Sequence, residues 1–289
     1  MFSKSISSVL VSTLFAAGAA SAAASAPLTL EVFNPGEEAI FPVASVLVAG
    51  KHDAVLIDAQ FSRAEAQKLV EKIRASGKKL TTVYISHSDP DFYFGLDVIK
   101  AAFPKAKIVA TPETVAEIRR KADAKVAYWG PILKDNAPKS IVIPEALTGK
   151  RIALEGQSLD IAGPTPARTY VWIPSIKAVV GGVVLFGNLH VWMADTQSAQ
   201  SRQDWLKTLD GIAALSPVTV VPGHFKVGSP LTPDSISYTR DYVVTFEAET
   251  AKAANSAALI EAMKMRYPKA GLEGALETSA KVAKGEMKW

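Results

Sequence analysis

Four side chains able to bind a metal ion or move a proton stand at the ends of two apolar segments of this sequence. His87, Asp89 and Asp91 directly follow an apolar, β-branched run of the kind that forms a buried strand, and His224 follows a second such run. Imidazole nitrogen and carboxylate oxygen both bind zinc, iron or manganese, and a catalytic site needs only about three protein ligands plus water. The four residues therefore predict one divalent metal ion, with zinc the first expectation and iron or manganese the alternatives.

The chemistry predicted for such a site is hydrolysis. A bound ion lowers the pKa of its water towards about 7 and polarises a carbonyl group, which leaves Asp91 or Asp89 to take up the proton. The substrate would be a small molecule of the ester, lactone or amide type. Without a metal, Asp89 and Asp91 could act as an acid and base pair, as paired carboxylates do in glycosidases.

Four further residues are candidates for supporting roles. His190, Tyr93 and Trp192 are predicted substrate contacts, and Asp58, at the end of an earlier strand, is predicted to orient His87. Three of them have a structural alternative: His190 could bond loop backbone, Tyr93 could pack the turn, and Asp58 could cap a helix.

The elements that must position these residues alternate between strands and helices. Residues 43–57 predict two strands joined by a turn, and Ser62 with Glu65 forms a capping box that opens a helix. The run Leu80 to Ser86 predicts the buried strand that leads into His87. A later helix begins at Thr111-Pro112 and is expected to end before Trp129.

The second half repeats this alternation. Tyr170 to Ile173 and Ala178 to Phe186 predict a pair of strands, and a helix is expected from Ser201 to Leu215. A helical segment opens near Thr232 and reaches roughly Arg266, after which the sequence is weakly patterned. Two sheets packed face to face with helices outside follow from this order.

Several of these motifs together resemble the metallo-β-lactamase-fold hydrolases. They are the strand that ends in Ser86-His87, the H-x-[HD]-x-D spacing, Gly95 four residues after Asp91, and the segment Val220 to His224. The segments 172–175 and 187–195 are similar to the middle region of that superfamily's exported branch. The resemblance covers about residues 43–224 and implies an αββα sandwich of two mixed sheets with outer helices.

The family's metal-binding motif is degenerate in this sequence. The usual pattern is H-x-H-x-D-H, in which His87, Asp91 and the later His224 match family ligands. Other ligand positions carry different residues: Asp89, Phe92 and Val183. The whole chain has four histidines, so a standard dinuclear site with five histidines is excluded. The resemblance therefore leaves a hydrolase with one metal ion or, as the alternative, a metal-free member that binds a small molecule or serves as a scaffold in the periplasm.

Composition and the first residues predict an exported globular protein. The chain has 289 residues, 48% hydrophobic and 21% charged, with no cysteine. One lysine, an apolar run and a small-residue tract predict a signal peptide over residues 1–22, followed by a metallo-β-lactamase-like domain over 23–230 and a helical extension over 231–289. The expected location is the periplasm, or the medium after secretion. A net charge of +4 is too small to indicate a nucleic-acid partner, and no later segment predicts a transmembrane helix.

Overall fold

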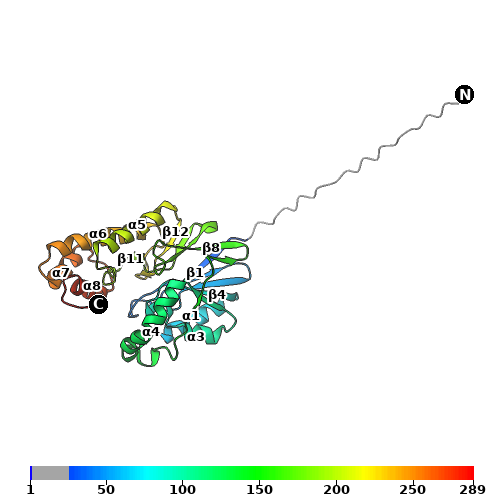
Figure 1. Cartoon of the computed structure of the whole chain (residues 1–289), viewed down its shortest axis with the longest axis horizontal. Helices are drawn as coiled ribbons and strands as arrows, with labels where there is room; N and C mark the ends of the chain where they lie inside the picture. Colours follow the sequence, from blue (N-terminus) through cyan, green and yellow to red (C-terminus); the bar gives the residue numbers. More distant parts are fainter. Residues whose placement is uncertain (2–25) are drawn as a thin grey trace.

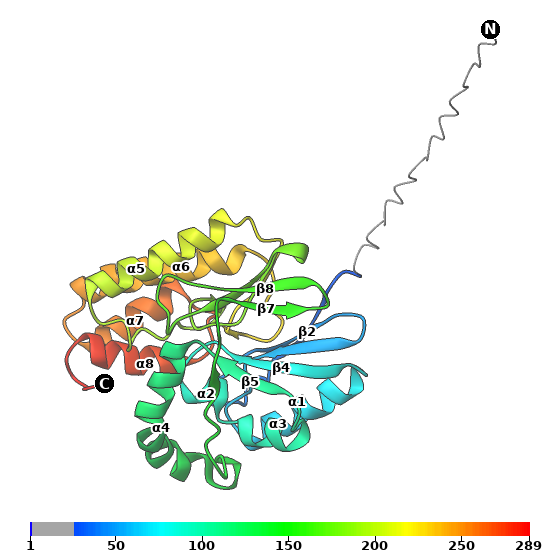
Figure 2. The same ribbon diagram turned by 45° about the vertical axis from the view of Figure 1, so that its right-hand side comes forward.

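The structure is a computed structural model that describes residue 1 and residues 26–289. The predicted signal peptide lies outside the described residues except for Met1. Figures 1 and 2 show four layers, with α1, α3 and α4 on one side of two central sheets and α5 to α8 on the other. Within the described residues, no helix has the length and apolar character needed to cross a membrane.

The first sheet carries the candidate site at the end of its fourth strand. Its strands lie in the order β1 (Thr29–Phe33), β2 (Ser45–Ala49), β3 (Asp53–Ile57), β4 (Lys79–Ile85), β5 (Lys107–Ala110) and β6 (Glu145–Ala146). The first three strands are antiparallel, and β3 to β6 are parallel. The predicted hairpin and the buried strand before His87 are confirmed.

The second sheet lies across the core from the first. Its order is β12 (Thr219–Val221), β10 (Ala178–Val180), β9 (Tyr170–Ile173), β8 (Gln157–Ala162) and β7 (Arg151–Leu154). A separate pair, β11 (Phe186–Gly187) and β13 (His224–Phe225), is parallel. The prediction of one strand from Ala178 to Phe186 is wrong, because Gly181 and Gly182 adopt φ angles of 72° and 84° that end β10.

The helices of the first half cover the outer face of the first sheet. They are α1 (Arg63–Ala75), α2 (Pro90–Tyr93), α3 (Leu96–Ala102) and α4 (Pro112–Leu133), followed by a short 3-10 turn, η1 (Lys134–Asn136). The predicted capping box at Ser62 is present, with Ser62 Oγ accepting the Glu65 N–H at 3.2 Å. The expected end of α4 before Trp129 is wrong. Trp129 packs edge-on against the rings of Phe41 and Phe61, and this packing holds the last helical turn in place.

The helices of the second half cover the outer face of the second sheet. After the 3-10 turn η2 (Pro174–Ile176) they are α5 (Ala199–Ala214), α6 (Asp234–Lys252), α7 (Ser256–Arg266) and α8 (Glu273–Ala283). The helix expected from Ser201 starts earlier, because Ser198 is its cap and its Oγ accepts the Ser201 N–H at 3.0 Å. The weakly patterned end of the sequence contains α8, whose Leu276 and Ala280 are fully buried.

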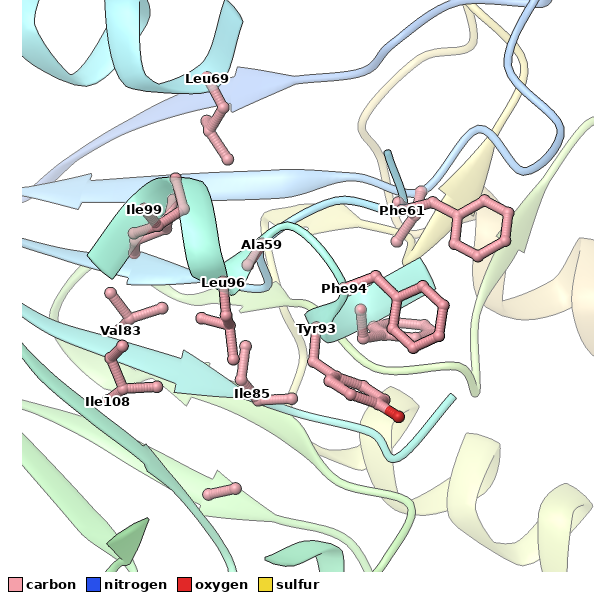
Figure 3. Packing of buried hydrophobic residues seen from close by; sticks show 14 of the residues in the cluster. Ala59, Phe61, Leu69, Val83, Ile85, Tyr93, Phe94, Leu96, Ile99 and Ile108 are labelled. Carbon is pink, nitrogen blue, oxygen red and sulfur yellow. The ribbon is translucent and has the colours of Figure 1, made fainter. Parts of the chain in front are cut away.

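Three buried clusters hold the layers together. One lies between the sheets and includes Val48, Ile57 and Val171. A second lies under α1 and α3, where Figure 3 shows Leu96 and Ile99 among buried side chains that include Val83, Ile85 and Ile108. The third joins α5 to α8 to the second sheet. A fully buried Leu or Ile side chain contributes about 1.5–3 kcal/mol, so these clusters fix the strand ends that carry the site.

Candidate functional site

The turn between β4 and α2 holds His87 and Asp89 as a local pair. His87 Nδ1 lies 3.3 Å from Asp89 Oδ2 and accepts the Asp89 backbone N–H at 3.2 Å. Asp89 is the extended residue before α2, and Pro90 at the first helical position fixes the turn. His87 Nδ1 is therefore already hydrogen-bonded within the turn, to the backbone of Asp89.

Asp91 and His224 form a second pair, built from distant parts of the chain. Asp91 lies in the first turn of α2, and its Oδ2 is 3.3 Å from His224 Nε2 on β13. Phe186, on the paired strand β11, stacks on the His224 ring with a centroid distance of 5.1 Å. The other ring nitrogen of His224, Nδ1, is buried without a hydrogen-bond partner among the described residues.

The Phe92 ring lies between the two imidazoles. Its centroid is 5.4 Å from that of His87 and 5.5 Å from that of His224, edge to face in both contacts. Phe92 is fully buried. The four predicted ligands are therefore two acid and imidazole pairs separated by an apolar ring.

This arrangement does not fit a firmly held metal ion. No group of three or more His, Cys, Asp or Glu side chains in residues 26–289 is placed to hold one. Each pair supplies one imidazole and one carboxylate, whereas catalytic zinc sites use about three protein ligands. Val183, at a family ligand position, adds no donor beside the second pair.

Asp89 lies near two positively charged side chains, those of Lys125 and Arg168. The Arg168 backbone bridges to His87, which brings the Arg168 guanidinium close to Asp89 and Asp195. Burial by itself raises the pKa of Asp89, but His87, Lys125 and Arg168 outweigh it and hold that pKa well below its usual value. Asp89 is therefore ionised at neutral pH and is a poor proton donor.

Asp58 supports the site through Ser86 and does not touch His87. Its Oδ1 accepts the Ser86 N–H at 2.8 Å and its Oδ2 accepts the Ser86 hydroxyl at 2.7 Å, while Gly182 N–H donates to the same hydroxyl at 3.0 Å. Burial, and to a lesser extent the charge of Asp91, raises the pKa of Asp58 to about 7. Asp58 therefore fixes the residue that precedes His87.

His190 and Tyr93 are packed into the protein and do not line the cleft described below. His190 is 1% exposed, its Nδ1 is 3.0 Å from the Tyr242 hydroxyl, and burial lowers its pKa to about 4. The Tyr93 ring lies edge-on against Phe94, and its hydroxyl is buried with no hydrogen-bond partner in the described part of the chain. Figure 3 shows Tyr93 beside Phe94, whose ring stacks in turn on Phe61 at 5.8 Å.

A largely aromatic cleft opens over Asp89 and over the Asp91 and His224 pair. Six aromatic side chains line it: Phe41, Phe61, Trp129, Phe186, Trp192 and Trp289. The charged and ionisable groups in its walls are Asp89, Asp91, Asp195, Lys125 and His224. Of the predicted substrate contacts, Trp192 lines this cleft.

Asp195 accepts hydrogen bonds from two of these tryptophans at the cleft wall. It accepts the indole N–H of Trp192 at 2.7 Å and that of Trp289 at 2.8 Å, and the two rings are 5.0 Å apart. Lys125 Nζ lies 5.5 Å from the centroid of the Trp289 ring. In both views the end of the chain lies near α4 (Figures 1 and 2). Trp289 and Lys125 were not predicted, because neither belongs to a motif.

Comparison with known proteins gives a consistent family and fold. Residues 40–224 match the family model described as the metallo-beta-lactamase superfamily. No significant match is found among curated proteins.

Similar solved structures share the fold at low sequence identity. A metallo-beta-lactamase from Pontibacter korlensis is 18% identical with a TM-score of 0.54, over 76% of this chain and 96% of that one. The DIM-1 metallo-beta-lactamase is 19% identical with a TM-score of 0.54, over 76% and 99%. A metallo-beta-lactamase family protein from Thermus thermophilus is 16% identical with a TM-score of 0.62, over 89% and 91%. The chain belongs to the metallo-beta-lactamase superfamily and has its hydrolase-type fold.

Proposed function

We propose that this protein binds a small, largely apolar molecule in the aromatic cleft without a resident metal ion. The observation that carries the proposal is the lining of the cleft, in which six aromatic side chains surround a few ionisable groups. Ligand sites typically have mostly apolar walls and a few placed polar groups. Here the polar groups are Asp89, Lys125, Asp195 and the Asp91 and His224 pair.

Saturable binding of a neutral aromatic probe tests this proposal. N-phenyl-1-naphthylamine, whose emission rises in apolar surroundings, is titrated into the purified protein. Replacing Trp129→Ala removes one wall and is expected to weaken binding about tenfold, which corresponds to about 1.4 kcal/mol. The matched control is Ile132→Ala, because Ile132 lies on the same helix, is 47% exposed and does not line the cleft. No saturable binding, or an equal loss in both variants, would overturn the proposal.

The single-metal hydrolase predicted from the sequence is the second candidate. It is favoured by the 3.3 Å between Asp91 Oδ2 and His224 Nε2. Two ligands that each lie about 2.1 Å from one ion are separated by a similar distance. This candidate needs a third donor, which residues 26–289 do not place beside the pair. Elemental analysis of protein purified without chelator separates the two candidates: about one equivalent of zinc, iron or manganese per chain supports the hydrolase.

We also propose that the protein acts after export, in the periplasm or the medium. The support is the sequence pattern of residues 1–22, and cleavage is expected near Ala22. Determining the first residue of the protein recovered from a periplasmic fraction tests this. A chain that retains Met1 and stays in the cytoplasm would contradict it.

A further inference from the structure

The rings around the cleft meet at steep angles. Phe41 contacts Trp129 at 5.5 Å and 81° and Trp192 at 6.0 Å and 90°, while Phe61 contacts Trp129 at 5.2 Å and 87°. Trp192 and Trp289 extend this chain of rings across the cleft at 5.0 Å and 70°. Rings that meet edge to face do not bury their flat sides against one another, so the cleft is surrounded by several aromatic rings of differing orientation.

The protein already places an ammonium group against one of these rings. Lys125 Nζ lies 5.5 Å from the centroid of Trp289, within the range of a cation–π contact. Lys125 and Trp289 both line the cleft. The contact shows that a positively charged nitrogen fits beside this aromatic wall.

The charges in the cleft wall favour a cation. Three carboxylates, Asp89, Asp91 and Asp195, line the cleft against the single ammonium of Lys125. The two hydrogen-bond partners of Asp195 are neutral indoles, which leave its charge uncompensated by direct contact. Arg168 lies near Asp89 and Asp195, and His87 pairs with Asp89, but both side chains are outside the cleft lining.

We propose that the ligand of this cleft is a small organic cation, a quaternary ammonium or N-alkylated amine, held by the aromatic rings and the surrounding carboxylates. The inference rests on the proposed binding function and adds the chemical class of the ligand. Such rings attract a cation through the negative face of their π system, and neighbouring carboxylates add to the attraction.

Displacement of N-phenyl-1-naphthylamine by two molecules of the same shape tests this class. Choline carries a quaternary nitrogen where 3,3-dimethyl-1-butanol carries a neutral carbon. We expect choline to displace the probe at a concentration about fivefold to tenfold lower. Equal potency, or stronger displacement by the anion 3,3-dimethylbutyrate, would overturn the inference while leaving probe binding intact. Absence of probe binding would instead overturn the proposed function.

Two variants locate the cation preference. Lys125→Met removes the resident ammonium and is expected to improve choline displacement about fivefold, a gain that damage to the fold would not produce. Its control is Arg119→Met, which also removes one positive charge from α4, at an exposed position outside the cleft lining. Trp129→Leu is expected to lower choline potency more than that of the alcohol. Identical changes in Lys125→Met and Arg119→Met would show that the effect comes from net charge alone, and would contradict the assigned position.

Discussion

At the level of single residues, Phe92 has a large chemical consequence, because its ring separates two imidazole and carboxylate pairs. His87 and His224 both contact this ring, at nearly equal centroid distances. In the family motif this position carries a histidine that serves the same metal as the preceding aspartate. The change from histidine to phenylalanine therefore removes a donor and also fills the space between the remaining ones.

Phe92→His is expected to create a zinc site. The new imidazole would stand beside Asp91 and His224 and raise the number of donors to about three, the number that catalytic zinc sites use. Elemental analysis after zinc incubation and desalting should give about one equivalent in the variant and well below that in the natural protein. Phe92→Leu is the control, since it removes the ring without adding a donor. Equal zinc in Phe92→His and Phe92→Leu would contradict the assignment.

Asp58 gives the fold a pH dependence of known sign. Burial raises its pKa from 3.8 to about 7, so between these values the folded chain keeps a proton that the unfolded chain has lost. The free energy of unfolding therefore falls as pH rises through this window, by roughly 4 kcal/mol at most.

Asp58→Asn removes this titration while it keeps an acceptor for the Ser86 N–H. The free energy of unfolding is measured with urea from about pH 4 to about pH 8. As pH rises, the value for the variant should increase relative to that for the natural protein, by roughly 4 kcal/mol at most. Asp123→Asn, at an exposed position on α4, is the control and should run parallel to the natural protein. Parallel curves for Asp58→Asn would show that Asp58 is already ionised in the folded protein.

Among the secondary-structure elements, the turn between β12 and β13 depends on Gly223. A Cβ at this position would lie 2.0 Å from the backbone oxygen of Gly182, so the two segments touch closely just before His224. This contact places the His224 ring against Phe186 and Asp91. The position of the histidine is thus set by backbone packing between two loops.

Gly223→Ala is expected to cost about 1–3 kcal/mol in the free energy of unfolding, because backbone must shift to admit the new methyl group. Gly211→Ala on α5 is the matched control. A Cβ there meets nothing within 4 Å, and replacing a helix glycine with alanine typically stabilises by about 0.5–1 kcal/mol. Urea denaturation measures both changes. A loss of stability at Gly211 or none at Gly223 would contradict this account.

The sequence predicted those elements whose signals are local. Ser62 and Glu65 marked the start of α1, and the β-branched run before His87 marked β4. Elements that depend on tertiary contacts were missed. The last turn of α4 is held by Trp129 packing, and the buried face of α8 consists largely of small residues, alanine and serine. The position of Trp289 in the cleft follows from that helix, so no motif could indicate it.

On the scale of the whole molecule, the cleft is assembled from segments far apart in the chain. Phe41 and Phe61 come from the first half, Trp129 from α4, Trp192 from the loop before α5, and Trp289 from the segment after α8. The helices α6 to α8 share one buried cluster with the second sheet, which sets where Trp289 can lie. The cleft therefore depends on the packing of both halves.

Trp289→Ala should separate ligand binding from stability. Trp289 is 41% exposed, so its removal is expected to change the free energy of unfolding by less than about 1 kcal/mol. The cleft loses a wall and the edge-on partner of the Trp192 ring, so binding of N-phenyl-1-naphthylamine should weaken about fivefold, or about 1 kcal/mol. Met287→Ala, two residues earlier and outside the cleft lining, should leave probe affinity unchanged. If Trp289→Ala binds the probe as tightly as the natural protein, Trp289 is not part of the binding site.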